Sequence, residues 1–286
     1  MRTSWGSASD RGRVRDVNED ALLACPPVFL VADGMGGLDA GAVASRVAVE
    51  EFARLAGRPA VGTADVLACL DSAWARLREE LTGDRQGGTT VAGVATVEDD
   101  GRPSWLVFNV GDSRVYRWAD GVLHQVTADH SVVQELLAEG RLSPAEVARH
   151  PERNVLTRAL GTGQRPEPDL WILPAGPDDR FLVGTDGLTR EVQVGRIAEL
   201  LSREPDPRQA AAALVAEALT NGGTDNVSVV VVDGDTSELV DDATDAAETA
   251  RDGLPRQRED TGSTVAPAPA PAPSAPVPAV RPGRHS

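Results

Sequence analysis

Five short segments of the chain place an acidic residue beside glycine or asparagine, each at the end of an apolar run. In chain order they are Asn18-Glu19-Asp20, Asp33-Gly34-Met35-Gly36-Gly37, Gly111-Asp112-Ser113, Asp186-Gly187 and Asp225-Asn226. A single Asp-Gly pair is most often a β-turn, but this explanation is weaker for several pairs at successive strand ends. Carboxylates that strand ends present on a rigid sheet can converge on hard divalent cations, which prefer oxygen ligands.

The order of apolar patterns predicts strands and helices in clusters. Short apolar or alternating runs predict strands, and they read VFLVA, TTVAGVATV, SWLVFNVG, SRVYRW, VLHQVT, DLWIL, RFLVGTD and NVSVVVVD. Helical spacing follows the first run and recurs over Thr63 to Leu81, in IAELL and in PRQAAAALVAEALTN. Because strands and helices are grouped rather than strictly alternating, the pattern favours an α+β layered domain.

Two regions depart from the strand pattern. Residues 131–158 are polar and helical, and Ser143-Pro144 supplies an N-cap followed by a first-turn proline. From about Thr236 the composition becomes acidic and then proline- and alanine-rich, with too little apolar mass to offset chain entropy. We therefore predict one domain over residues 1–235 with a helical insert near the site, and a disordered tail over residues 236–286.

The charged residues argue against several classes of protein. A formal net charge of -16 leaves no basic face for a phosphate backbone, so nucleic acid is not an expected partner. All 28 basic residues are arginine, which removes any P-loop, kinase-type or Schiff-base lysine. Any phosphate group must therefore be bound by arginine or by a metal ion.

The cysteines and the N-terminus indicate the cellular setting. Cys25 and Cys69 are too few for a disulfide framework in 286 residues, which fits a reducing cytosol. Met1 leads into polar residues without an apolar signal segment, and no run approaches eighteen uninterrupted apolar residues. We expect a cytoplasmic protein that is monomeric and has no membrane segment.

Asp33, Asp186 and Asp225 are the leading candidates for metal ligands. Each lies directly before or after a strongly apolar strand. Their mutual repulsion would raise the carboxyl pKa values unless cations lay between them. Metal binding would relieve that repulsion.

Eight fragments in a fixed order resemble one known family. They read RVRDVNED, VADGMGGLDAGAVAS, GGTTVAGV, NVGDSRVYRW, DHS, TRALG, TDGLT and GGTDNVSVVVV, and they extend over about residues 3 to 233. Together they resemble the metal-dependent (PPM, type 2C) serine/threonine protein phosphatases, and DGMGG with NED fits the bacterial branch best. The resemblance implies an α+β fold, a four-layer α/β/β/α sandwich of two mostly antiparallel β-sheets, with residues 131–158 as a flap that contacts phosphoprotein substrates.

The resemblance also implies roles for the acidic segments. Asp33 would bridge two Mn2+ or Mg2+ ions, and Asp186 and Asp225 would complete one of them. The Gly34 carbonyl with the Glu19-Asp20 pair would serve the other ion, directly or through water. Which of the two paired acids contacts the ion stays open.

Asp112 resembles the ligand of a weaker third ion in bacterial members, with Asp186 as its partner. The alternative is a turn aspartate that caps Ser113 or Arg114.

The chemistry that the resemblance implies is direct hydrolysis of phosphoserine and phosphothreonine. A water shared by two divalent cations is acidified enough to attack phosphorus in line, with Asp33 and Asp186 as catalytic metal ligands. Arg15 stands where the family keeps its phosphate-binding arginine, whose planar fork suits a phosphoryl group. The alternatives are a surface salt bridge for Arg15 and a phosphate-binding role for Arg13.

Several residues depart from the family pattern or lack a clear role. Met35 replaces the histidine that serves some members as a general acid, so a metal-bound water is the expected proton donor. Leu38 and Ala42 replace a histidine and a glutamate common in bacterial relatives, which predicts tuned rather than abolished activity. His130 is expected to orient the loop into the flap, and Arg158 either anchors the flap or forms a structural ion pair.

Two other functions use the same residues. A phosphatase-like scaffold could bind phosphoproteins or a signalling partner without turnover, although the retained carboxylates weigh against it. A calcium-binding structural domain would need more ligands per ion from one contiguous loop, whereas these are scattered over two hundred residues. The expected physiological role is to oppose a serine/threonine kinase by acting on its targets.

Overall fold

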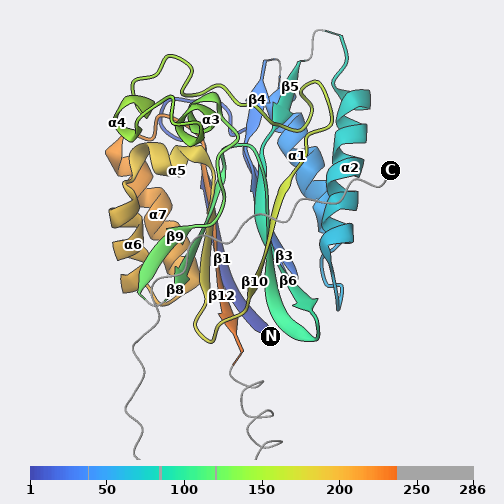
Figure 1. Cartoon of the computed structure of the whole chain (residues 1–286). Helices are drawn as coiled ribbons and strands as arrows, with labels where there is room; N and C mark the ends of the chain where they lie inside the picture. The colour runs from blue at the N-terminus through green and yellow to red at the C-terminus, as the bar shows by residue number, and fades with distance from the viewer. Residues whose placement is uncertain (38, 84–85, 120, 237–286) are drawn as a thin grey trace, which may run out of the picture.

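Two five-stranded antiparallel sheets pack face to face between two layers of helices (Figure 1). The computed structural model describes residues 1–236 except 38, 84–85 and 120. The predicted α/β/β/α sandwich is confirmed, with every strand pair antiparallel. The predicted tail lies outside the described residues from 237 onward, as does Leu38.

The first sheet has the order β1-β12-β11-β8-β9. Its strands are β1 (Arg2–Asp10), β12 (Val227–Asp235), β11 (Arg180–Gly184), β8 (Arg114–Ala119) and β9 (Val122–Gln125). The last long strand of the domain therefore lies between its first strand and β11, which ties the two chain ends of the domain into one sheet.

The second sheet has the order β10-β7-β6-β3-β2. Its strands are β10 (Asp169–Pro174), β7 (Arg102–Val110), β6 (Val91–Asp99), β3 (Val28–Ala32) and β2 (Ala21–Cys25). A short ribbon of β4 (Gly34–Gly36) and β5 (Gly87–Thr89) extends beyond one end of this sheet.

Helices cover the outer face of each sheet (Figure 1). The helices α1 (Ala40–Ala53) and α2 (Thr63–Glu80) lie on the second sheet. The first sheet is covered by α5 (Asp186–Glu191), α6 (Val194–Arg203) and α7 (Pro207–Asn221). The predicted helical insert contains α3 (Val132–Ala138) and α4 (Pro144–Val147). Both helices lie at the same end of the sandwich as the β4–β5 ribbon (Figure 1).

Alternating side chains of each central strand enter different cores. In β12, Val229 and Val231 face the helices, whereas Val230 and Val232 lie between the sheets. Because both faces of this strand are buried, successive residues are apolar in the run Val229–Val232. Trp105 joins the two sheets, since its ring lies 4.8 Å from that of Phe181.

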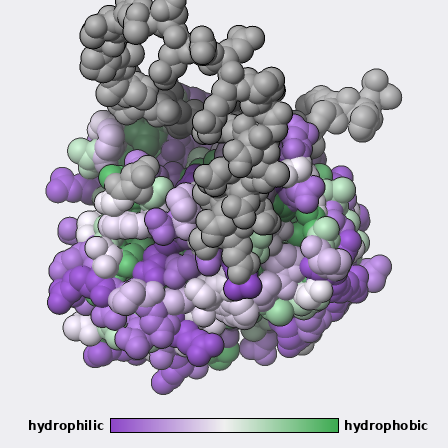
Figure 2. All heavy atoms as spheres, turned by 90° about the horizontal axis from the view of Figure 1, so that it is seen from below, coloured by the Kyte–Doolittle hydropathy of each residue, from purple (hydrophilic) through white to green (hydrophobic). Residues whose placement is uncertain are grey.

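The outer surface is mostly hydrophilic at the end of the sandwich seen in Figure 2. Across residues 1–236, apart from the four undescribed positions, no helix is long and apolar enough to cross a membrane. Cys25 and Cys69 are both free.

The antiparallel registers bring the acidic segments to one edge. Ala21 pairs with Ala32, so the Glu19-Asp20 pair before β2 lies beside Asp33 after β3. In the other sheet β11 ends at Gly184, which pairs with Val229, so the residues that follow β11 lie beside those that precede β12. The strand ends therefore converge from both sheets.

Candidate metal centre

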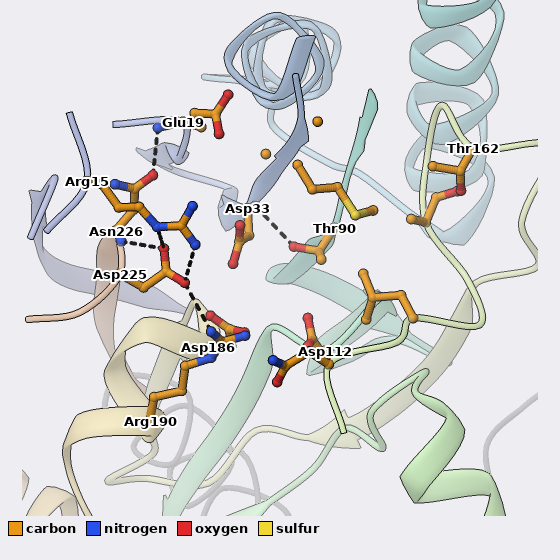
Figure 3. Close-up of a pocket in the computed structure, with 16 residues that line it drawn as sticks. Arg15, Glu19, Asp33, Thr90, Asp112, Thr162, Asp186, Arg190, Asp225 and Asn226 are labelled. Atoms are coloured by element: carbon orange, nitrogen blue, oxygen red, sulfur yellow. Dashed lines mark hydrogen bonds and ion pairs between the residues drawn. The ribbon is translucent and has the colours of Figure 1, made fainter. Parts of the chain in front are cut away.

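A cavity of about 390 Å³ lies at this edge, and Asn154 and Leu156 of the predicted flap line part of it. Acidic residues from all five segments surround it, together with two arginines (Figure 3). The charged lining residues are Arg15, Glu19, Asp33, Asp112, Asp186, Arg190 and Asp225. Carboxylates that are 200 positions apart in the chain thus face one another, as the sequence predicts.

Backbone and hydroxyl contacts hold Asp33 in place. The Asp33 amide donates to Thr90 Oγ1 at 3.1 Å, and Thr89 Oγ1 donates to the Asp33 carbonyl at 3.0 Å. The Thr90 hydroxyl also lies 2.7 Å from Ser113 Oγ, beside Asp112. These contacts use the backbone of Asp33 and leave its carboxylate directed into the cavity (Figure 3).

Asn226 fixes the loop that carries Glu19. The Glu19 amide donates to Asn226 Oδ1 at 2.8 Å, and Asn226 Nδ2 donates to the carbonyls of Arg11 and Val17, both at 2.9 Å. The Glu19 residue lines the cavity, whereas Asp20 is half-buried and does not line it. Asp20 is nevertheless close enough to Asp33 that burial and their mutual repulsion together raise the pKa of Asp33.

Only one of the two oxygens of the Asp20 carboxylate has a hydrogen-bond partner among the described residues. Thr185 Oγ1 donates to Oδ2 at 3.0 Å, but Oδ1 is buried and has no hydrogen-bond partner among the described residues. A buried oxygen without a donor is costly unless a cation or an ordered water binds it.

Two arginines approach Asp225 from opposite sides. Arg15 makes a two-pronged contact, with Nε 2.9 Å from Oδ1 and Nη2 2.9 Å from Oδ2. Arg190 pairs with Asp186 and, through Nη1 at 3.1 Å, with Asp225 Oδ2. Arg13 does not line the cavity, and its backbone amide bonds the Gly223 carbonyl instead. The geometry therefore favours Arg15 over Arg13 for contact with an anion.

Burial and mutual repulsion raise the pKa values of the clustered carboxyls. Burial, followed by repulsion from Asp20 and Asp186, raises the pKa of Asp33 well above its ordinary value. Burial likewise raises the pKa of Asp20 and that of Asp112 to about 7. Burial also raises the pKa of Asp186, although Arg190 opposes the shift. The site thus holds more negative charge than its arginines neutralise.

The donor set fits hard divalent cations. All candidate ligands are carboxylate or carbonyl oxygens, which suit Mg2+ and Mn2+ rather than zinc. Among the described residues no three His, Cys, Asp or Glu side chains already stand as a closed metal-binding group. Asp186 and Asp225 are turned toward arginines, which accounts for the open arrangement. The orphaned Asp20 Oδ1 and the repulsion at Asp33 support the fit.

The other predicted residues lie around this centre. Gly34 and Met35 line the cavity. The Arg114 guanidinium pairs with Asp129. Within the described part of the chain, the Asp112 side chain caps neither Ser113 nor Arg114. His130 is buried and bonds Gly111, and Arg158 bonds Asp169 at 2.8 Å at the end of the flap.

Sequence reasoning assigned no role to four residues that the structure brings into or beside the cavity. They are Thr90, Thr185, Arg190 and Asn226. The first two and Asn226 lie within the fragments GGTTVAGV, TDGLT and GGTDNVSVVVV, and Arg190 directly follows TDGLT. Their polar side chains beside predicted ligands were the available signal.

Comparison with known proteins places this geometry in a known family. The protein phosphatase 2C family profile matches residues 12–227. The serine/threonine protein phosphatase PstP of Mycobacterium tuberculosis is 40% identical over 236 residues, which cover 80% of this chain and 44% of PstP. The chain thus spans less than half the length of that relative.

Two further relatives match over nearly their whole length. The serine/threonine phosphatase stp of Listeria monocytogenes is 34% identical over 253 residues, which cover 82% of this chain and 97% of stp. A crystal structure of the PstP catalytic domain in complex with 2 manganese ions superimposes with a TM-score of 0.72 at 34% identity. It covers 81% of this chain and 97% of that domain.

Proposed function

The chain belongs to the protein phosphatase 2C family, and we propose that it is a metal-dependent serine/threonine phosphoprotein phosphatase. The observation that carries the proposal is the convergence of half-buried, mutually repelling carboxylates and Arg15 in one cavity. A phosphate monoester needs a cationic site that binds its oxygens and positions a water for in-line attack. This cavity supplies the residues for both tasks.

The carboxylates are proposed to hold Mn2+ or Mg2+. Asp33 would lie between two ions, Asp186 and Asp225 on one side, and the Gly34 carbonyl with Glu19 and Asp20 on the other. Bound there, the ions supply Lewis acidity, which lowers the pKa of a shared water and neutralises phosphoryl charge. The manganese in the PstP catalytic domain supports this choice of ion.

Arg15 is proposed to bind the phosphoryl group. Its side chain is about half exposed and already makes a two-pronged contact with a carboxylate, the geometry that a phosphoryl group also accepts. Because Arg15 shares Asp225 with Arg190, it can turn to an incoming anion without leaving that carboxylate uncompensated.

The flap, residues 131–158, is proposed to contact phosphoserine or phosphothreonine proteins beside the cavity. Asn154 and Leu156 of the flap line the cavity. The names of the relatives support serine/threonine phosphoproteins as the substrate class. We further propose that the chain acts as a monomer against the products of a serine/threonine kinase, with residues 1–235 as the catalytic domain.

Hydrolysis of a phosphothreonine peptide tests the proposal. Turnover should require manganese, proceed more slowly with magnesium and cease with chelator. Asp33→Asn should lower kcat/KM by about 100-fold or more, because bridging charge worth several kcal/mol is lost. Small aryl phosphates should also be hydrolysed, since the proposed contacts involve the phosphoryl group alone.

The matched control is Asp100→Asn. Asp100 lies in the exposed β6–β7 turn with φ 49°, a conformation that asparagine adopts equally well. Its activity should equal that of the wild type. Manganese-dependent turnover no higher than that of Asp33→Asn would refute the enzyme and favour a phosphoprotein-binding scaffold. Calcium binding without turnover would favour the structural calcium domain.

A further inference from the structure

Arg190 lines the candidate metal centre, although 38% of its side chain remains exposed. The helix α5 begins at Asp186, and Arg190 follows one turn later on the same face. Its guanidinium pairs with Asp186 Oδ2 and, at 3.1 Å, with Asp225 Oδ2 (Figure 3). The sequence resemblance assigned no cation to this position.

The guanidinium stands at the junction of two cavities. A second cavity of about 570 Å³ lies under the flap and adjoins the first. The residues that line both are Asp112, Asn154, Asp186 and Arg190. Arg190 therefore borders the space between Asp112 and Asp186, the pair expected to hold a third divalent ion. Among the described residues no side chain, Arg190 included, forms a hydrogen bond or ion pair with Asp112, so the positive charge of Arg190 acts on it through space.

The charges balance without a third ion. The centre has six acidic groups, Glu19, Asp20, Asp33, Asp112, Asp186 and Asp225. Two divalent cations would neutralise four of these charges, and Arg15 and Arg190 would neutralise the other two. A third divalent ion between Asp112 and Asp186 would lie beside this guanidinium, which two carboxylates hold in place, and the two like charges would repel each other.

We propose that Arg190 is a resident cation of the centre that takes the place of a third divalent ion beside Asp112 and Asp186. The chain then binds two divalent ions and no third. The inference rests on the proposed function, because it presupposes that the core carboxylates bind two ions. An arginine is covalently tethered and always charged, so this positive charge does not depend on the metal concentration.

Counting bound manganese in the full chain tests this inference. Equilibrium dialysis against excess Mn2+, followed by elemental analysis, should give two ions per wild-type chain and two per Arg190→Lys chain. Arg190→Gln, which removes the charge, should bind three, and the double variant Arg190→Gln/Asp112→Asn should return to two. Arg203→Gln removes an exposed arginine whose only ion pair within the described part of the chain is with Glu199 on α6, and it should stay at two.

A second variant keeps the test valid if Arg190→Gln does not fold. Asp112→Asn alone should bind two ions like the wild type, because Asp112 holds none. Three ions in the wild type, or a loss of one ion in Asp112→Asn, would overturn the inference about Arg190 but not the proposed metal centre. It would also be overturned if Arg190→Gln bound two ions, whether more tightly or not. A wild-type chain that binds no manganese would overturn the proposed metal centre as well.

Discussion

Thr185 and Asp20 are 165 positions apart in the chain, yet Thr185 Oγ1 donates a hydrogen bond to Asp20 Oδ2 at 3.0 Å. The same Thr185 oxygen accepts from the Ser228 amide at 3.0 Å. One hydroxyl thus links an acidic residue before β2 to the backbone of β12, in the opposite sheet. Asp20 Oδ1 has no hydrogen-bond partner among the described residues. The bond from Thr185 to Oδ2 therefore determines the direction in which the Asp20 carboxylate points.

Replacing Thr185 by valine should weaken manganese binding. The change keeps the β-branched shape but removes the donor to Asp20 and the acceptor for the Ser228 amide. The loss of a contact that orients a metal ligand typically lowers metal affinity by about 10- to 100-fold, and we expect a loss of about 10-fold here. The buried amide left unpaired should also lower the free energy of unfolding by about 1–3 kcal/mol. Calorimetric manganese titration and urea unfolding measure the two effects.

The matched control is Thr220→Val on the exposed side of α7. Its hydroxyl bonds only the Ala216 carbonyl within the helix. Unfolding should change by less than about 0.5 kcal/mol, with manganese affinity unaltered. Equal affinity in both variants would show that the bond to Asp20 does not orient a ligand.

The metal-free chain should lose stability as pH rises toward neutrality. Burial raises the pKa of Asp20 and of Asp112 to about 7, from 3.8. The folded state therefore holds protons that the unfolded state releases. The stability that they contribute is full below about pH 3.8 and disappears as pH rises through about 7. Saturating manganese should thus raise the melting temperature more at pH 7.5 than at pH 5.5. Thermal melts at both pH values measure this difference. A manganese-induced shift in melting temperature that is independent of pH would contradict the account.

The central strands could be predicted from sequence because both of their faces are buried. VFLVA and the VVVV of NVSVVVVD are continuous apolar runs, since alternate residues enter different cores. The edge strand β1, RTSWGSASD, has no such run, because only Gly6 is fully buried along it. The helix α5 begins on Asp186 and is one and a half turns long, so contacts with α7 rather than helical periodicity determine it.

The acidic ligands could be predicted, whereas their supporting contacts could not. Strand ends and repeated Asp-Gly pairs are local signals. The bonds of Asn226 to Arg11 and Val17, by contrast, depend on which strands become neighbours. The same is true of Arg190, whose pairing with Asp225 joins α5 to the start of β12.

Glu51 should contribute to stability without affecting the metal centre. It is fully buried on α1, with Oε1 2.7 Å from Arg76 Nη1 on α2. Arg76→Ala should lower the free energy of unfolding by about 3 kcal/mol, because among the described residues it leaves the buried carboxylate paired only with the exposed Arg54. The control Arg46→Ala removes an exposed pair at 3.7 Å and should cost less than about 0.5 kcal/mol. Equal effects in urea unfolding would refute a special role for the buried pair.

His130 should position the turn that carries Asp112. Its Nδ1 accepts from the Gly111 amide at 3.1 Å, and its own amide donates to the Gly111 carbonyl at 2.9 Å. The Nε2 atom lies 3.3 Å from Asp169 Oδ2 without regular hydrogen-bond geometry. Asparagine can reproduce the Nδ1 acceptor, whereas glutamine reaches only the Nε2 position.

His130→Asn should therefore remain close to the wild type. His130→Gln leaves the buried Gly111 amide unpaired and should destabilise the chain by about 1–3 kcal/mol. It should also raise KM for a phosphopeptide more than it lowers kcat, because the flap begins at the next residue, Ser131. Steady-state kinetics separate the two parameters, and indistinguishable variants would remove His130 from any positioning role.

Gly187 should tolerate no side chain, although it lies within a helix. A Cβ on this residue would stand 1.9 Å from the Asn226 carbonyl oxygen, so Asn226 or the start of α5 must move. Asn226 holds the Glu19 amide and adjoins Asp225, so the displacement would disturb two candidate ligands. Gly187→Ala should reduce manganese affinity at least about 10-fold and destabilise the fold by about 1–3 kcal/mol.

Gly195→Ala is the matched control, because a Cβ there meets nothing within 4 Å on α6. It should leave manganese binding unchanged and stabilise the chain by about 0.5–1 kcal/mol, as alanine does in place of an unconstrained helical glycine. Calorimetric titration of both variants separates the explanations for the Asp186-Gly187 pair. If Gly187→Ala bound manganese like Gly195→Ala, Gly187 would not be needed for close packing at the metal centre.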